Sequence, residues 1–288
     1  MSCQICPRHC NIDRDTSAGY CRTGNTPIVA KVMRHMWEEP IISGDRGSGI
    51  VFFSGCNMKC IFCQNEEISH HIKGKPYTPK ALADLFKMIE DSGVSNINLA
   101  TPTHFVDGII RALDIYKPNI PIVYNTGTYE SIETLRRLEG YIDIYLPDLK
   151  YSDNALAIQL SKANGYFDIA TRAILEMYRQ QPRDIIENGL MKKGVIVRHL
   201  VLPQCIENSR GVAQWLIDNI PHDKYISIMS QFTPHGDLEG AEFLTRRLKP
   251  LEYRIIVNML DCFDNAYIQE FSSSNEEFIP DFDKEIEL

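Results

Sequence analysis

The sequence predicts an α/β protein. Its main domain is expected to be a partial (β/α)6 barrel, a wedge of the eight-unit TIM-like arrangement, preceded by a small metal-binding extension. The length of 288 residues suits a single α/β barrel. Apolar runs of strand length alternate with stretches of helical periodicity, which indicates parallel βαβ units. The strand segments are apolar throughout, as expected where helices cover both faces of a sheet.

The expected elements follow one another from residue 28 onward. A short β segment at 28–33 precedes a loop rich in turn formers at 43–49. Pro79 suits the first turn of a helix that Gly93 ends. The barrel strands are expected at residues 49–54, 96–100, 120–124, 141–146, 194–202 and 225–229. The helices are expected at residues 79–92, 105–116, 131–138, 155–162, 169–180, 212–220, 239–248 and 252–263.

This order divides the chain into three parts. A cysteine-rich metal-binding extension covers residues 1–48, the partial barrel covers 49–270, and an acidic tail covers 271–288. From Ser274 onward, six acids and one lysine give the tail a net charge of −5. We expect this tail to be a solvated end of the chain.

The composition argues against several classes of protein. Hydrophobic residues make up 44% and charged residues 24%, which is typical of a packed globule. A net charge of −8 without a basic stripe argues against nucleic acid as a partner. No apolar run approaches the ~20 residues of a membrane helix, and the N-terminus lacks the apolar core of a signal peptide. We therefore expect a cytoplasmic protein with no membrane partner, whose nine cysteines are not a disulfide framework.

Three cysteines directly after the first barrel strand are the strongest signal. Cys56, Cys60 and Cys63 are separated by three and then two residues. Thiolates are the usual ligands of a four-iron cluster, so three of them leave one iron open for another ligand. A zinc site or three reduced core cysteines are the alternatives. Zinc pairs have a second Cys pair farther along, and no such pair follows Cys63. Polar neighbours such as Asn57 and Lys59 fit poorly with a packed core.

A second group of cysteines opens the chain. Its spacings are two, three and ten residues, and the segment is too short to bury a core of its own. Zinc held by four thiolates and a second iron–sulfur cluster both remain open as interpretations. His9 is a possible substitute ligand, although a solvent-facing side chain is the simpler reading. The candidate ligands are Cys3, Cys6, Cys10 and Cys21. The two remaining cysteines, Cys205 and Cys262, are expected to pack as small apolar residues.

Polar or ionisable residues follow every predicted barrel strand. Because parallel strands end at the same edge of a barrel, these residues are expected to gather around one site. After the cysteine loop they are Thr101, Thr103 and His104, then Asn125 and Thr126, then Asp148 and Lys150, then Arg198, and last Ser230 and Gln231.

The Cys-x3-Cys-x-aromatic-Cys pattern, with Phe62 as its aromatic residue, resembles the signature of the radical S-adenosylmethionine (SAM) superfamily. From Gly49 to about Phe232 the chain is similar to activating enzymes of glycyl radical enzymes, pyruvate formate-lyase activase above all. It is more similar still to an activase-like branch that shares the N-terminal Cys-Pro-Arg segment, the Glu38-Glu39-Pro40 stretch and Arg198-His199-Leu200.

The resemblance implies a role for each candidate residue. The three cysteines would bind a [4Fe-4S] cluster whose open iron takes the amino and carboxylate groups of SAM. Phe62 would lie near the adenine, and Asn125 and Thr126 near the amino acid part of SAM. Asp148 and Lys150 would contact the SAM carboxylate or a nearby cation, and Arg198 the ribose and adenine. Many family members have Gly-Gly-Glu after the second strand, where this chain has Thr101, Thr103 and His104 as candidate SAM contacts.

The function that this implies is reductive cleavage of SAM to a 5′-deoxyadenosyl radical, which abstracts hydrogen from a substrate. The expected partners are an external one-electron donor of the flavodoxin or ferredoxin type and, as leading substrate, a glycyl radical enzyme. Modification of a small molecule or another peptide is the alternative within the class. A non-catalytic iron–sulfur electron carrier is the alternative from another class, and the polar groups at five further strand ends argue against it.

Overall fold

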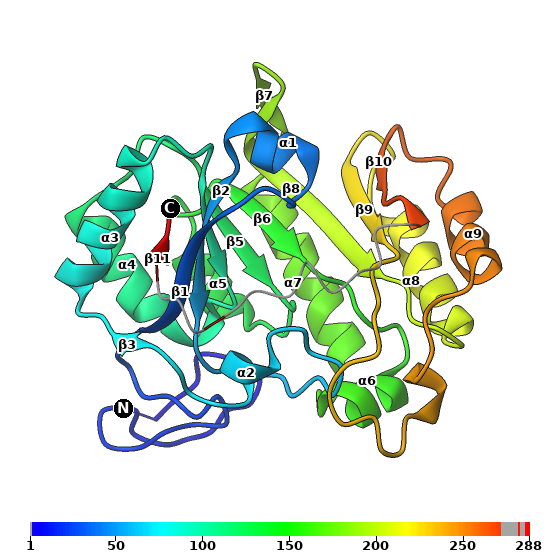
Figure 1. Cartoon of the computed structure of the whole chain (residues 1–288), viewed down its shortest axis with the longest axis horizontal. Helices are drawn as coiled ribbons and strands as arrows, with labels where there is room; N and C mark the ends of the chain where they lie inside the picture. The colour runs from blue at the N-terminus through cyan, green and yellow to red at the C-terminus, as the bar shows by residue number, and fades with distance from the viewer. Residues whose placement is uncertain (1, 272–281, 283–285) are drawn as a thin grey trace.

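The protein is built around one curved, mostly parallel sheet with helices on its outer side, as Figure 1 shows. A computed structural model describes residues 2–271, 282 and 286–288. Seven neighbouring strands, β2-β4-β5-β6-β8-β9-β10, run parallel, while β1 is antiparallel to β2 at one edge. Short strands β3 and β7 add antiparallel pairs to β1 and β8. The strands are β1 Ile28–His35, β2 Ser48–Phe53, β3 Lys75–Pro76, β4 Ile97–Ala100, β5 Ile122–Thr126, β6 Ile144–Pro147, β7 Ile185–Glu187, β8 Leu190–Leu200, β9 Tyr225–Met229, β10 Asn265–Ile268 and β11 Ile286–Glu287.

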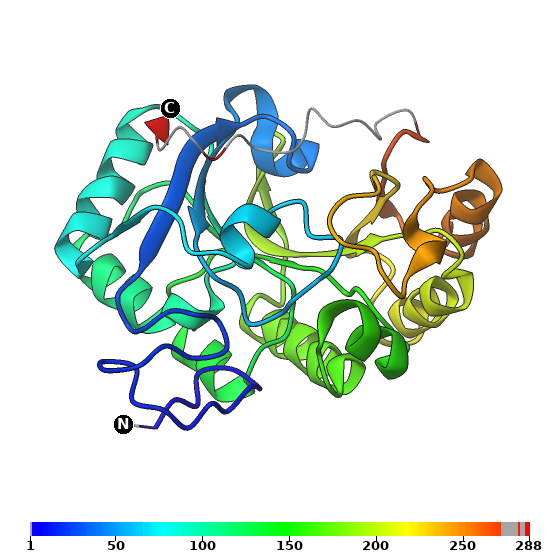
Figure 2. The same cartoon turned by 60° about the horizontal axis from the view of Figure 1, so that its bottom comes forward.

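Helices α3 to α9 connect successive parallel strands and cover the outside of the sheet (Figures 1 and 2), whereas the short α1 packs against Val123, Ile144 and Ile196 of three strands. In α3, Thr78 accepts a hydrogen bond from the Ala81 N–H at 3.2 Å and Pro79 occupies the first turn, so capping and proline fix its start. The helices are α1 Pro40–Ser43, α2 Glu66–Ser69, α3 Pro79–Asp91, α4 Val106–Ile115, α5 Ile132–Arg137, α6 Asn154–Ser161, α7 Tyr166–Gln180, α8 Ile206–Asn219 and α9 Pro250–Met259. Three 3-10 turns are η1 Gly44–Arg46, η2 Thr103–Phe105 and η3 Glu242–Leu244.

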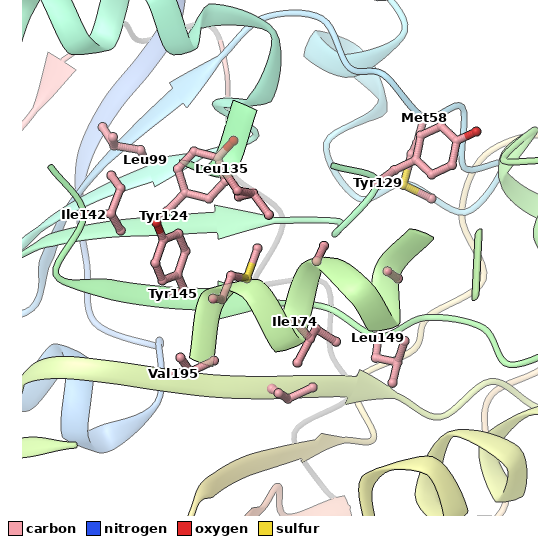
Figure 3. Packing of buried hydrophobic residues seen from close by; sticks show 14 of the residues in the cluster. Met58, Leu99, Tyr124, Tyr129, Leu135, Ile142, Tyr145, Leu149, Ile174 and Val195 are labelled. Atoms are coloured by element: carbon pink, nitrogen blue, oxygen red, sulfur yellow. The ribbon is translucent and has the colours of Figure 1, made fainter. Parts of the chain in front are cut away.

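The main core lies between the sheet and its outer helices. Figure 3 shows Tyr124 of β5 and Tyr145 of β6 side by side, with Ile174 of α7 among the residues beneath them. The two tyrosine rings meet edge to face with centroids 5.9 Å apart, and both side chains are fully buried. This packing fixes α7 against the strands whose ends carry several of the predicted site residues.

The predicted fold class is confirmed. The sheet is mostly parallel and, among the described strands, its two ends do not pair with each other, so the barrel is open. The structure adds β10 as a further parallel strand and the β7–β8 hairpin, neither of which the sequence patterns predicted. No helix of the described chain combines the length and the apolar character needed to cross a membrane.

Two expectations for the C-terminal third were wrong. The helix expected at 239–248 is only the 3-10 turn Glu242–Leu244, because Gly240 adopts φ +74° beside it and Pro250 starts the next helix. The tail is not simply a solvated end: Ile286–Glu287 pairs with β1, and the Phe282 ring packs edge to face on Phe52 at 5.5 Å. Residues 272–281 and 283–285 of the predicted acidic tail lie outside the described residues.

Candidate active site

A cavity of about 490 Å³ lies inside the open barrel. Side chains of β2 and of β10, from nearly opposite ends of the sheet, both line it, so the sheet curves around it. Its volume falls within the range of ~300–1,000 Å³ that small-molecule sites occupy. Eleven of the twelve residues predicted for the cluster and for SAM line this cavity: Cys56, Cys60, Phe62, Cys63, Thr101, Thr103, Asn125, Thr126, Asp148, Lys150 and Arg198.

The loop after β2 places three cysteines at one end of the cavity. Cys56, Cys60 and Cys63 are partly buried and free of disulfides. Each sulfur accepts a hydrogen bond from the protein: Cys56 from the Met58 N–H at 3.3 Å, Cys60 from the Ser161 hydroxyl at 3.0 Å and Cys63 from the Ser69 hydroxyl at 3.3 Å. Such bonds stabilise a sulfur that carries negative charge. Burial raises the pKa of the Cys56 thiol to about 12, so a bound cation is what would hold it as a thiolate.

This donor set is compatible with a four-iron cluster. Within the described part of the chain, no group of three or more His, Cys, Asp or Glu side chains is placed to hold a single metal ion. Thiolates of a four-iron cluster bind different irons, so they lie farther apart than the ligands of one zinc ion. The three sulfurs, their hydrogen-bond donors and the adjoining cavity are therefore compatible with a [4Fe-4S] cluster that keeps one iron open.

A chain of alternating charges runs along the cavity wall away from the cysteines. Lys150 Nζ lies 2.7 Å from Asp148 Oδ2, and Asp148 Oδ1 accepts from Arg198 Nε at 2.8 Å. The Arg198 guanidinium then donates to Glu38 Oε2 at 3.1 Å and to the Asn125 side-chain oxygen at 2.7 Å. These side chains are nearly buried, so the attractions among them are screened far less than on the surface.

The electrostatics of this chain follow from burial and from the two cations. Burial opposes ionisation of Asp148, but the charges of Arg198 and Lys150 outweigh it and lower the pKa of the carboxyl group. Burial raises the pKa of Glu38 and of Glu39, an effect that the Arg198 charge partly offsets. The Oε2 atom of Glu39 is buried and accepts no hydrogen bond from the described residues. Arg198 is therefore the cation that partly offsets the burial of both glutamates, while Asn125 donates a further hydrogen bond to Glu38 at 3.3 Å.

The Glu130 carboxylate accepts hydrogen bonds from the hydroxyl groups of two predicted contact residues. Its Oε1 atom accepts from Thr103 at 2.6 Å and from Thr126 at 2.5 Å, with the Tyr124 hydroxyl 3.3 Å away. Burial raises the pKa of Glu130, while these hydroxyl groups lower it. Thr101, at the end of β4, has φ +58°, a left-handed conformation that is uncommon outside glycine and often marks a functional site.

His104 is the predicted contact residue that does not line the cavity. Its ring is buried beside Phe105, and its Nε2 atom lies 2.9 Å from the carbonyl oxygen of Ser54. Burial lowers the pKa of His104 to about 3, so the neutral ring donates to Ser54. The residue supports the start of the cysteine loop from behind instead of facing the cavity.

The sequence reasoning missed several residues that shape the site. Glu38 and Glu39 were noted as a shared stretch and were given no role, although both line the cavity. Tyr166 was not singled out: its hydroxyl lies 2.6 Å from the Asp148 carbonyl oxygen and accepts the Lys150 N–H at 3.0 Å. This hydroxyl group fixes the backbone at the end of β6. No local sequence pattern predicts such a contact.

The N-terminal cysteines lie behind the cysteine loop. Figure 1 shows their segment, in dark blue, at the end of the sheet where α2 lies. Cys6 and Cys21 are buried, and Cys3 and Cys10 are partly exposed. The exposed His9 ring contacts Gln4, in keeping with a solvent-facing side chain. A metal at these cysteines stays a prediction.

The chain belongs to the radical SAM superfamily. The family model described as "Radical SAM superfamily" matches residues 50–191, which include the cysteine loop and the ends of β4, β5 and β6. An uncharacterised protein of Methanocaldococcus jannaschii is 31% identical over 260 residues, which is 86% of this chain and 70% of that protein.

Solved structures show the same fold. SuiB of Streptococcus suis bound to S-adenosylmethionine matches with a TM-score of 0.51 at 14% identity, over 77% of this chain and 50% of SuiB. SuiB bound to the precursor peptide SuiA matches with a TM-score of 0.51 at 14% identity, over 76% of this chain and 48% of SuiB. This chain thus spans about half the length of SuiB.

Proposed function

We propose that this protein is an enzyme that reductively cleaves SAM at a [4Fe-4S] cluster held by Cys56, Cys60 and Cys63. The observation that carries the proposal is the single cavity that joins these thiols to a polar wall inside a radical SAM fold. When bound, the cluster supplies one electron that breaks the C5′–S bond of SAM, giving methionine and a 5′-deoxyadenosyl radical that takes a hydrogen atom from the substrate.

The cavity residues would bind and orient the cofactor. Lys150 carries a positive charge toward the cysteine end, where the charge of Cys60 and the carboxylate of Asp148 both favour it. It is therefore the cation that we propose for the carboxylate of SAM. Asn125 offers amide groups at the end of β5, and Phe62 packs edge to face on Phe232 at 6.0 Å to give an apolar wall suited to adenine.

We propose a glycine of a partner glycyl radical enzyme as the hydrogen donor, and a flavodoxin- or ferredoxin-type protein as the electron donor. This rests on the resemblance to activases and on the cavity, which is lined by both edges of the open barrel. Trp37 lines the cavity and is 70% exposed, so it marks where the cavity reaches the surface. A small molecule or another peptide as substrate is the alternative, and SuiB, which was solved with a precursor peptide, is the precedent for a peptide.

Anaerobic turnover tests the proposal. The reconstituted protein is mixed with dithionite and SAM, and 5′-deoxyadenosine and methionine are quantified by mass spectrometry. We expect both products from the wild type and from Cys205→Ala, a buried cysteine outside the site. We expect neither the central cluster nor cleavage from Cys60→Ala, because one iron loses its thiolate. Full cleavage by Cys60→Ala would contradict the assignment. A four-iron cluster without any cleavage, with and without candidate partners, would favour an electron carrier.

A further inference from the structure

The cysteines of the N-terminal segment come together in the fold. Gly19 lies between two of them, because a Cβ atom added to Gly19 would lie 3.4 Å from Cys10 Sγ and 3.7 Å from Cys21 Sγ. Cys6 and Cys10 flank a turn in which the His9 N–H donates to the Cys6 carbonyl oxygen at 3.1 Å. Cys3 joins them through the backbone, since its carbonyl oxygen accepts the N–H of Asn11, the residue after Cys10.

These sulfurs receive hydrogen bonds in the same way as the sulfurs of the central loop. Cys6 accepts from the N–H of Arg8, two residues on, as Cys56 accepts from Met58. Cys10 accepts from the Tyr20 N–H at 3.3 Å, and the Thr23 hydroxyl lies 3.2 Å from Cys21. Cys6 and Cys10 thus have a backbone donor, and Cys21 has a hydroxyl group within hydrogen-bond distance. Hydrogen bonds to the sulfurs are one of the factors that set the reduction potential of an iron–sulfur cluster.

The N-terminal segment packs directly against the central loop. The carbonyl oxygen of Cys21 lies 2.4 Å from where a Cβ on Gly55 would be, so only glycine fits immediately before the first central cysteine. Arg8 Nε donates to the Asn57 carbonyl oxygen at 2.7 Å. The Tyr20 N–H donates to Cys10 at 3.3 Å, and Lys59 Nζ of the central loop lies 5.9 Å from the centre of the Tyr20 ring. Tyr20 therefore connects the N-terminal thiols with the central loop.

The charges around the segment favour a negatively charged centre. Residues 1–35 carry five Lys or Arg against two Asp, a net charge of +3 in an acidic protein. The Arg8 guanidinium lies 3.9 Å from the centre of the Tyr20 ring, and the buried Arg14 guanidinium donates to the His104 carbonyl oxygen at 2.5 Å. A four-thiolate iron–sulfur cluster becomes more negative on reduction, so neighbouring cations favour its reduced form.

A single zinc ion held by the four thiolates is the alternative occupant of this segment. The two groups of thiols lie against each other and both have backbone N–H groups that donate to their sulfurs, which favours the same kind of centre in both.

We propose that Cys3, Cys6, Cys10 and Cys21 hold a second iron–sulfur cluster that passes electrons to the central one. The inference rests on the proposed function. The N-terminal cluster would accept one electron from a reduced flavodoxin- or ferredoxin-type donor, which is thereby oxidised. It would then pass this electron to the central cluster, whose first cysteine follows Gly55. The partly exposed Cys3 and Cys10 face the donor side, and the buried Cys21 lies on the side of the central loop.

The test uses the full chain with the central thiols removed. The variant Cys56→Ala/Cys60→Ala/Cys63→Ala is reconstituted anaerobically, its iron, sulfide and zinc are measured, and EPR spectra are recorded before and after dithionite. We expect about half of the wild-type iron, no stoichiometric zinc and a signal from a reduced four-iron cluster. Mixing this variant with reduced flavodoxin or ferredoxin should bleach the cluster absorbance. Cys205→Ala/Cys262→Ala is the control and should keep all of the wild-type iron.

Each other outcome overturns a distinct claim. One zinc per chain, or no metal at all in a folded central variant, contradicts an N-terminal iron–sulfur cluster. A cluster that dithionite reduces and the protein donors do not contradicts the role in electron transfer. Wild-type iron content in the central variant would leave the N-terminal cluster in place and would instead contradict the proposed function. The measurement does not depend on SAM cleavage, so the two proposals fail separately.

Discussion

Replacing Arg198 by Met tests how far the charges inside the barrel hold the fold together. Met fills a similar apolar volume and removes the guanidinium that bridges Asp148 and Glu38, both of which are nearly buried. Removal of one partner from a buried ion pair costs about 3–5 kcal/mol, because the remaining charge stays out of water. We therefore expect Arg198→Met to lower the free energy of unfolding by about 4 kcal/mol at pH 8. Arg198→Lys, which keeps a charge without the planar fork, should lose about half as much.

The stability that Arg198→Met loses should depend on pH, and the carboxyl groups near Arg198 determine in which direction. Burial raises the pKa of Glu38 and of Glu39, and without Arg198 these pKa values rise further. The folded variant then binds protons at a pH where the unfolded chain does not, so its stability increases as the pH falls from 8 to 6. Urea unfolding of the apoprotein, followed by circular dichroism, measures this. Arg179→Met is the matched control, since its side chain is 49% exposed and its pairs should contribute at most about 1 kcal/mol. A loss below 1 kcal/mol in Arg198→Met, or an equal loss at both pH values, would refute the reasoning.

Two further substitutions test buried contacts on either side of the site. Burial lowers the pKa of His199 to about 4, whereas an unfolded chain has about 6.5, so this histidine should account for about 2 kcal/mol of the stability lost between pH 7 and pH 5. The buried His104 adds a similar loss, so His199→Gln should reduce the total by about 2 kcal/mol and the exposed His222→Gln should leave it unchanged, as urea titrations at the two pH values will show. Gly55→Ala should lower both the unfolding free energy and the iron content, because its Cβ would lie 2.4 Å from the Cys21 carbonyl oxygen at φ +85°. Gly93→Ala, at φ +79° with open space around it, separates backbone strain from the clash, and equal losses in the two variants would contradict the close contact.

The sequence predicted the cavity wall because the repeat of strand and helix determines where strands end. Asn125, Asp148 and Arg198 are far apart in the chain, yet each follows or ends a buried strand, and parallel pairing brings them within hydrogen-bond distance. The cysteine loop follows the same rule, because β2 is a continuous apolar run with a glycine after it. Positions that the period and direction of strands determine were therefore predictable.

Contacts that depend on tertiary packing were not. His104 follows β4 and was expected in the cavity, but the 3-10 turn Thr103–Phe105 turns its ring under Ser54. Glu38 could not be assigned to the site from the sequence. It lines the cavity because β1 runs antiparallel to β2, so that the loop after β1 returns to the barrel interior. A short β segment carries no signal for which neighbour it pairs with or in which direction.

The antiparallel strand β1 explains how the cavity has a carboxylate end as well as a thiol end. Because β1 runs against β2, its last residue lies opposite the start of β2, and the loop that follows brings Glu38 and Glu39 to the end of the cavity remote from the cysteines. The charged wall is then anchored at that end by carboxylates from outside the βα repeats, while Lys150, at the other end, faces the thiols. The pairing of Arg198 with Glu38 and Asp148 fixes the strand ends before any ligand is bound. A cofactor that carries both an ammonium and a carboxylate group meets donors and acceptors already in position, so its binding energy is not spent on ordering them.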